Sequence, residues 1–317
     1  MKALLFSVVM AIAVLVEPTN AQKPSPNPNQ VAILRWYQAN QTTNFAVGLN
    51  PSGVAFDGAN IWVANTNDNN LSKLRANDGA LLGTFAVPSG PQGLSFDGAN
   101  IWVASLGDNS VSKLRASDGV LLGTFAVGLE PIGIAFDGIN IWVVNNGNRV
   151  SKLRASDGSV LGNFAVGVTP YWLAFDGADI WVTNHSDNTV SKLRASDGAV
   201  LGTFAVGAFP ADLAFDGANI WVANNGDNTV SKLRARDGAL LGTFAVGTSP
   251  VGVVFDGANI WVANSNSDSV TKLRASDGSL LGTFTVTTNP FTAPFHMAFD
   301  GSNVWVTDAN ILTVSKL

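Results

Sequence analysis

The chain has 317 residues, of which 13% are charged and 32 are glycine, and its formal net charge is −5. The low charge and high apolar content argue against a disordered chain, and the abundant glycine argues against a helical bundle. The absence of cysteine excludes disulfides, thiolate metal sites and thiol catalysis. The acidic balance leaves no basic face for a nucleic-acid partner.

The N-terminus carries the pattern of a secretory signal peptide. A lysine precedes an apolar run over 3–16, and small residues follow it up to position 21. This run is shorter than the ~20 residues of a membrane-spanning helix. We therefore predict a signal peptide over 1–21, a lead-in rich in proline and asparagine over 22–30, a secreted or periplasmic location, and no membrane span in the mature chain. The alternative is an uncleaved anchor or a buried segment.

The remaining residues, 31–317, repeat one unit of about 40 residues. Each unit reads Pro-x-Gly-Val-Ala-Phe, Asp-Gly-Ala-Asn, Ile-Trp-Val-Ala-Asn, a polar loop, Val-Ser-Lys-Leu-Arg, Ala-Ser-Asp-Gly and Leu-Leu-Gly-Thr-Phe-Ala-Val. The unit contains four short β-rich runs and two Asp-Gly turns, and no apolar period near 3.6 residues. The phenylalanines that open the Phe-Asp-Gly turns are Phe56, Phe96, Phe136, Phe175, Phe215, Phe255 and Phe299.

Seven units of four antiparallel strands predict an all-β, seven-bladed β-propeller, in which stacked blades bury one another's faces. Residues 34–48 align with the outer part of a unit, and residues 297–317 supply the inner part. We expect the N- and C-terminal strands to close the ring together in blade seven. Both 31–36 and 313–317 resemble the third strand. We expect the C-terminal copy to take that place and 31–36 to form an extra edge segment.

The units resemble the bacterial YVTN-type β-propeller repeat. The resemblance covers 31–317 and rests on an aromatic-Val-x-Asn strand, a polar loop and a Val-Ser strand. The stretch 212–233 shows it well, reading Asp-Leu-Ala-Phe-Asp-Gly-Ala-Asn-Ile-Trp-Val-Ala-Asn-Asn-Gly-Asp-Asn-Thr-Val-Ser-Lys-Leu. The resemblance implies a propeller of the surface, periplasmic or secreted kind.

A looser resemblance is to streptogramin lyases, which are seven-bladed and whose units contain Trp-Phe-Thr-Glu. The position of that glutamate holds asparagine in five units, Ser105 in one and Asp308 in the last. His296 lies one position after the place of a lyase histidine. This resemblance implies an alternative function, a lyase-like or lactonase-like enzyme that uses His296, Asp308 or Asp212. A lactonase site would also need a metal.

Two loops of each unit vary, while the Phe-Asp-Gly and Arg-Ala-x-Asp-Gly turns hardly change. The variable loops join the outer strand to the next inner strand and the second strand to the third. In a propeller both lie on one face, around the mouth of the central channel, and variation over a fixed scaffold is typical of a binding surface. The positions that open the inner strands are Gly53, Gly93, Gly133, Trp172, Asp212, Gly252 and His296.

From these departures we predict an aromatic-lined pocket at the channel mouth with a few polar anchors. Its candidate ligand-binding residues are Tyr171, Trp172, His185, Asp212, Phe291, Phe295 and His296. The competing interpretation is drift in the loops, with the aromatic side chains packing over the channel. We assign no catalytic residue, no cofactor and no metal.

The sequence favours a secreted or periplasmic binding protein whose partner is a small molecule, a glycan or a protein. The enzyme alternative uses the same mouth. A structural surface protein is a second alternative, because the units are nearly identical. The aspartates of the Phe-Asp-Gly turns are expected to accept backbone N–H bonds rather than to form a ring of metal ligands.

Overall fold

The computed structural model describes residues 43–286 and 293–317. The predicted signal peptide (1–21), the lead-in (22–30) and the segment 31–36 lie outside the described residues. So does Phe291.

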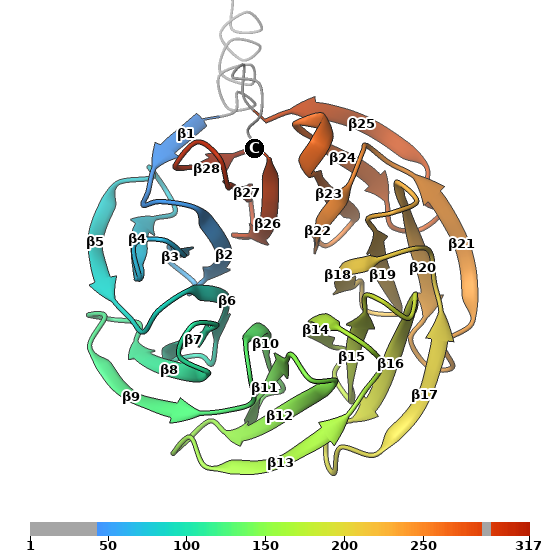
Figure 1. The fold of residues 1–317 in the computed structure, drawn as a ribbon. Coiled ribbons are helices and arrows are strands. Elements are labelled where there is room, and N and C mark those ends of the chain that lie inside the picture. The colour runs from blue at the N-terminus through green and yellow to red at the C-terminus, as the bar shows by residue number, and fades with distance from the viewer. Residues whose placement is uncertain (1–42, 287–292) are drawn as a thin grey trace, which may run out of the picture. The chain divides into compact units, whose positions relative to one another are not determined.

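The described chain forms seven four-stranded antiparallel sheets arranged as blades around a ring, which confirms the predicted seven-bladed propeller (Figure 1). The inner strands are β2 (Pro51–Phe56), β6 (Pro91–Phe96), β10 (Pro131–Phe136), β14 (Pro170–Phe175), β18 (Pro210–Phe215), β22 (Pro250–Phe255) and β26 (Pro294–Phe299). The second strands are β3 (Asn60–Asn65), β7 (Asn100–Ser105), β11 (Asn140–Asn145), β15 (Asp179–Asn184), β19 (Asn219–Asn224), β23 (Asn259–Asn264) and β27 (Val304–Asp308). The third strands are β4 (Asn70–Arg75), β8 (Ser110–Arg115), β12 (Arg149–Arg154), β16 (Thr189–Arg194), β20 (Thr229–Arg234), β24 (Ser269–Arg274) and β28 (Thr313–Lys316). The outer strands are β5 (Leu81–Ala86), β9 (Leu121–Ala126), β13 (Val160–Ala165), β17 (Val200–Ala205), β21 (Leu240–Ala245), β25 (Leu280–Thr285) and β1 (Thr43–Ala46). A short 3₁₀ helix, η1 (Ser265–Ser267), lies between β23 and β24.

Blade seven closes the ring with both ends of the described chain. Its strand order is β1-β28-β27-β26, and Phe45 of β1 lies opposite Val314 of β28. The C-terminal copy therefore holds the third place, as expected. Lys316 reaches into blade one, where its Nζ donates to the carbonyl oxygen of Ala76 at 2.9 Å. The ring thus has no open sheet edge between its first and last blades.

Each Phe-Asp-Gly turn is held by its own aspartate. In blade five, Asp216 accepts the backbone N–H groups of Ala218 and Asn219 through Oδ1 and the indole N–H of Trp221 through Oδ2, at 2.8 Å. Burial works to raise the pKa of Asp216, yet these hydrogen bonds hold it below its usual value. All seven repeat tryptophans make this bond. The prediction that these carboxylates serve their own turns is confirmed.

In five of the six Lys-Leu-Arg segments the lysine ties one blade to the next. Lys232 lies 4.8 Å from the ring centroid of the fully buried Trp221 and donates to the carbonyl oxygen of Ala275 in blade six at 2.7 Å. The arginine behaves differently, since Arg234 pairs with Asp237 of its own turn at 3.1 Å. Local neutralisation is thus the rule for the arginine, whereas among the lysines Lys192 and Lys272 pair with an aspartate of their own blade, Asp179 and Asp256.

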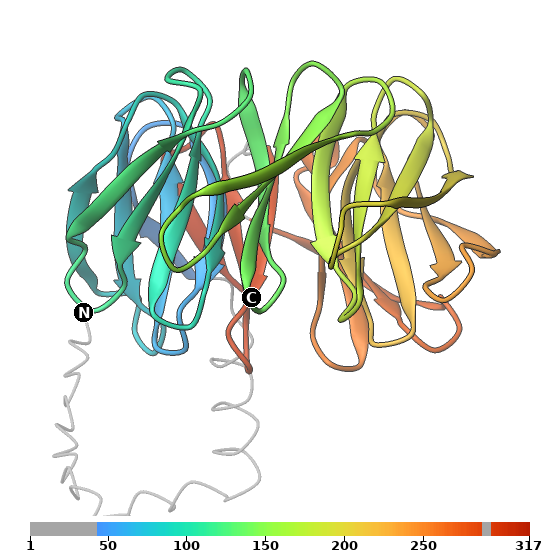
Figure 2. The ribbon, with the colours of Figure 1, turned by 90° about the horizontal axis from the view of Figure 1, so that it is seen from below.

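The two variable loops of a blade lie on one face of the propeller, here called the variable-loop face. In blade one these loops are 47–50 and 66–69, and they are joined by hydrogen bonds from Thr66 N–H to the Asn50 carbonyl and from Leu49 N–H to the Asp68 carboxylate. The side view shows the loops gathered at the two ends of the blades (Figure 2). Within the described ranges, the structure has no helix of the length and apolar character needed to cross a membrane.

Candidate functional site

Glycine at the third position of an inner strand has a steric reason. A Cβ on Gly53 would lie 2.1 Å from the carbonyl oxygen of Gln92, and a Cβ on Gly252 would lie 2.2 Å from that of Phe295. Both atoms belong to the inner strand of the following blade, which passes close by. The three side chains that replace glycine at this position are therefore specific departures from the repeat.

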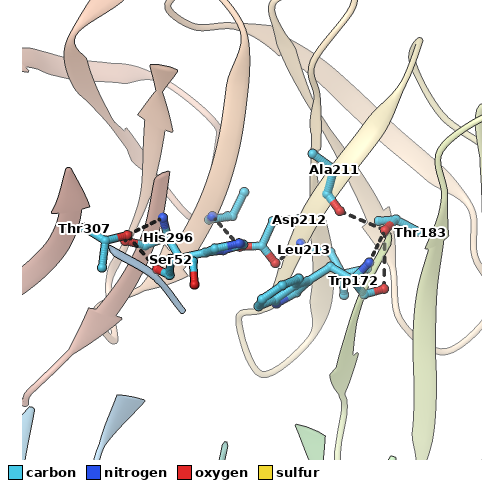
Figure 3. Close-up of polar contacts among 9 residues, drawn as sticks. Ser52, Trp172, Thr183, Ala211, Asp212, Leu213, His296 and Thr307 are labelled. Atoms are coloured by element: carbon cyan, nitrogen blue, oxygen red, sulfur yellow. Dashed lines mark hydrogen bonds and ion pairs between the residues drawn. The ribbon is translucent and has the colours of Figure 1, made fainter. Parts of the chain in front are cut away.

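These three side chains meet at the centre of the ring (Figure 3). Trp172 of β14 and His296 of β26 come from blades four and seven, yet their rings stack with centroids 3.9 Å apart and planes 20° apart. Nδ1 of His296 lies 3.8 Å from Oδ2 of Asp212 on β18. Phe295 meets the imidazole edge-on at 4.4 Å. We call Trp172, Asp212 and His296 the central cluster.

The central cluster is largely buried and well bonded. Asp212 and His296 are each only 4% exposed. The Asp212 carboxylate accepts the backbone N–H of Leu213 at 2.7 Å and that of Val253 in blade six at 2.9 Å. Side chains and backbone from blades four to seven are thus linked through one carboxylate and one imidazole.

Two buried threonines support the cluster, and the sequence analysis missed them. Thr183 accepts the N–H of Trp172 at 2.9 Å and donates to the carbonyl oxygen of Ala211 at 2.8 Å. Thr307 likewise accepts the N–H of His296 at 3.0 Å and donates to the carbonyl oxygen of Ser52 at 2.8 Å. The other five blades have alanine or valine at this position. Threonine replaces alanine or valine in the two blades that carry Trp172 and His296. That coincidence was the sequence signal that could have revealed the support of each ring-bearing residue by a threonine.

A second aromatic group lies on the variable-loop face at blades four and five. His185, in the loop after β15, has its ring centroid 5.8 Å from that of Tyr171 and 5.2 Å from that of Phe209. Its Nδ1 lies 3.3 Å from the carbonyl oxygen of Pro210. Phe209 is 49% exposed and has a φ of 54°, a left-handed conformation that is unusual for a bulky residue. We call Tyr171, His185 and Phe209 the aromatic wall.

The aromatic wall and the central cluster are electrostatically linked. Burial raises the pKa of the Tyr171 hydroxyl, and the negative charge of Asp212 raises it further. The two groups contain five of the seven predicted ligand-binding residues, and a sixth, Phe295, packs against His296 of the central cluster. The structure adds Phe209, which was not among the predicted residues.

Asp308, a candidate of the enzyme alternative, lies apart from the central cluster. It is fully buried on β27, where its Oδ2 accepts from Ser315 at 2.5 Å and from Thr313 at 2.9 Å, both on β28. Its Oδ1 has no hydrogen-bond partner. Burial raises the pKa of this carboxyl to about 6, against the opposing effect of the two hydroxyl donors.

The described residues contain no group of three or more histidine, cysteine, aspartate or glutamate side chains placed to hold a metal ion. The Asn/Asp-rich loops use their carboxylates on backbone instead. For example, Asp227 accepts the N–H of Ala208 at 2.7 Å.

Comparison with known proteins gives a fold and no family. No family model matches the chain, and no curated protein matches it. Among solved structures, hydrazine synthase of Kuenenia stuttgartiensis is similar with a TM-score of 0.75 and 16% identity, covering 84% of this chain and 95% of that one. A streptogramin B lyase structure is similar with a TM-score of 0.73 and 19% identity, covering 87% of this chain and 96% of that one. At such identities the likeness establishes the seven-bladed β-propeller fold alone, and membership of the YVTN-type family is not shown.

Proposed function

We propose that this protein is a secreted or periplasmic binding protein that holds its ligand on the variable-loop face, against the aromatic wall and above the central cluster. The observation that carries the proposal is Phe209. The left-handed conformation is shared by every blade at this position, which holds Asn50, Gly90, Glu130, Thr169, Ser249 and Ala293 in the sister blades. Phe209 alone places an aromatic ring there, half exposed and stacked on His185, in a conformation that costs a bulky residue free energy.

The chemistry of the wall favours a ligand with a flat or ring-shaped face. Phe209, His185 and Tyr171 supply aromatic surface at low cost in side-chain entropy, and the hydroxyl and imidazole supply polar contacts. The central cluster acts as a floor rather than as a direct contact, because Asp212 and His296 are almost fully buried. A small molecule or a glycan with a ring face fits this arrangement.

The test uses residues that the repeat already tolerates. Phe209→Ser and His185→Asn install the residues of blades six and five, and Asn50→Ser makes a matched change at the Phe209 position of blade one. A panel of oligosaccharides and heteroaromatic compounds is screened by thermal shift, and hits are measured by calorimetry. We expect the two wall variants to weaken binding at least tenfold and Asn50→Ser to bind like the unmodified protein. If no compound raises the melting temperature, or if all variants bind equally, the aromatic wall is not a binding site. Either result would favour the alternative of a structural surface protein.

A lyase-like enzyme is the second candidate, and the His296–Asp212 pair is the observation that favours it. An imidazole oriented by a carboxylate is the arrangement of a general base. The likeness to the streptogramin B lyase structure adds a candidate substrate class. Purified protein incubated with a streptogramin B compound would show loss of substrate that His296→Gly abolishes. Unchanged substrate with the unmodified protein would reject this candidate.

A further inference from the structure

Blade three departs from its sisters in the loop between its second and third strands. This loop has three residues, 146–148, whereas the loop of blade one has four, 66–69. In four sister blades an aspartate of this loop accepts a backbone N–H from the loop before the inner strand. These bonds are Leu49 N–H to Asp68, Ser89 N–H to Asp108, Val168 N–H to Asp187 and Ala208 N–H to Asp227. The shortening in blade three removes the aspartate, and the N–H of Leu129 has no acceptor among the described residues.

The same shortening leaves the two loops of blade three without a backbone hydrogen bond between them in the described chain, and only the Asn146 and Glu130 side chains connect them. In blade five, Asn225 N–H and Gly226 N–H donate to the carbonyls of Phe209 and Ala208, at 3.1 and 2.9 Å. No such backbone bond joins the corresponding loops of blade three within the described chain. A cavity of about 480 Å³ opens there, whereas the corresponding cavity of blade one measures about 260 Å³.

The cavity contains one cation and one unsatisfied buried oxygen. Arg149 lines it and forms no ion pair with any described residue; the sister blades have neutral residues at this position. Asn145 also lines the cavity and is 1% exposed, and its Oδ1 has no hydrogen-bond partner. In blades one, four and five the equivalent oxygen accepts a glycine N–H, whereas Oδ1 of Asn264 in blade six is unsatisfied as well. Blade three is the blade that combines this oxygen with a shortened loop and an arginine. Glu130 lines the adjoining cavity of about 440 Å³ instead, and its carboxylate accepts from Nδ2 of Asn146 at 2.6 Å.

We propose that this blade-three cavity binds a small molecule that carries a carboxylate next to a hydrogen-bond donor. The ligand carboxylate takes the place that the loop aspartate occupies in four sister blades. It accepts the N–H of Leu129 and pairs with Arg149, while the neighbouring hydroxyl or ammonium group donates to Oδ1 of Asn145. Arg149 is the only charged side chain that lines the described cavity, so the site favours an anion. The proposal concerns blade three alone and does not depend on the aromatic wall.

The probes are lactate and propionate, which differ by the hydroxyl group next to the carboxylate. Each is titrated into the ¹⁵N-labelled protein at constant ionic strength, with chloride as the reference salt, and the amide signals of Gly128 and Leu129 are followed. We expect saturable shifts at these amides, with tighter binding of lactate than of propionate. No saturation at Leu129 would overturn the site, and equal affinity for the two probes would overturn the role of Asn145.

Two variants built from sister sequences complete the test. Arg149→Thr installs the residue of blades four and five and should weaken lactate binding about tenfold or more, as expected for one charge-assisted contact. Inserting one aspartate between Gly147 and Asn148 restores the Asn-Gly-Asp-Asn loop of blade five and should abolish binding, because the protein then supplies its own carboxylate. Circular dichroism and melting confirm that each variant is folded. A folded insertion variant that binds lactate as tightly as the unmodified protein would refute the proposal.

Discussion

Asp308→Asn should stabilise the protein, and it should do so only above the pH at which Asp308 loses its proton. In five sister blades the equivalent residue is an asparagine whose Nδ2 donates to the hydroxyl of the third strand, as Asn145 does to Ser151 at 2.8 Å. In blade three that hydroxyl in turn donates to Asn163 on the outer strand at 2.6 Å. The chain of hydrogen bonds therefore runs from the second strand of the blade, through the third, to the outer strand.

Blade seven has the same chain with a carboxyl group in place of the amide. The Ser315 hydroxyl contacts both Asp308 Oδ2 and Asn44 Oδ1, at 2.5 and 2.9 Å. A hydroxyl group has one proton and can donate to only one of these oxygens. When Asp308 is protonated it donates to Ser315, which then donates to Asn44. When Asp308 is ionised, one acceptor is left without its donor.

The magnitude follows from the shifted pKa. Asp308 has a pKa of about 6 in the folded protein and 3.8 as its usual value, so the folded state binds the proton more tightly. This tighter proton binding adds to the free energy of unfolding. The contribution is fully present below pH 3.8 and is lost as the pH rises through 6. A difference of about 2 pKa units corresponds to about 3 kcal/mol, an order-of-magnitude value.

The assay is urea unfolding of both proteins across the range from pH 4 to pH 8. Since every other titrating group is shared, the difference between the two proteins isolates Asp308. We expect Asp308→Asn to be up to about 3 kcal/mol more stable at pH 8, with a difference that shrinks toward zero at pH 4. A difference that does not change with pH, or a variant that is less stable at pH 8, would refute the reasoning.

Three further changes test the scaffold. Trp221→Ala should cost about 3–5 kcal/mol in urea unfolding, because it leaves a large cavity between blades; a cost below ~1 kcal/mol would contradict this packing. Deleting Thr43–Ala46 exposes the edge of β28 and should lower the melting temperature and promote association, measured by light scattering; unchanged melting would show that β1 is dispensable. Thr183→Ala removes the hydroxyl bridge to blade five and should cost about 1–3 kcal/mol, while Ala223→Thr, the reverse change in blade five, should bring no comparable gain.

Much of the fold could be predicted from the sequence because each blade is a local structure repeated seven times. The Phe-Asp-Gly turn is satisfied within six residues, from Asp216 to Trp221, so its sequence alone defines it. Closure was also readable, since 313–317 matches the third strand of every other unit. The choice between the C-terminal copy and 31–36 was correct because β28 continues directly from β27.

The candidate site was only partly predictable. Glycine stands at this position in the four other blades, so Trp172, Asp212 and His296 stood out as departures. Nothing in their spacing showed that residues 124 positions apart would stack, or that Asp212 would be satisfied by Val253 of the next blade. The same holds for blade three. Phe136 and Phe175 are 39 residues apart instead of the usual 40, which indicates a missing residue but not the cavity.

The sequence by itself determined the number of blades, the order of strands and the residues that serve each turn, because those depend on contacts within about 40 residues. Only the tertiary structure decided which departures from the repeat meet. Closing the ring brings Trp172 of blade four against His296 of blade seven. Where the sequence predicted a pocket, the structure has a largely buried cluster and a partly exposed aromatic wall. The physical reason is that the inner strands of all seven blades surround one axis (Figure 1), so distance along the chain says nothing about distance across the ring.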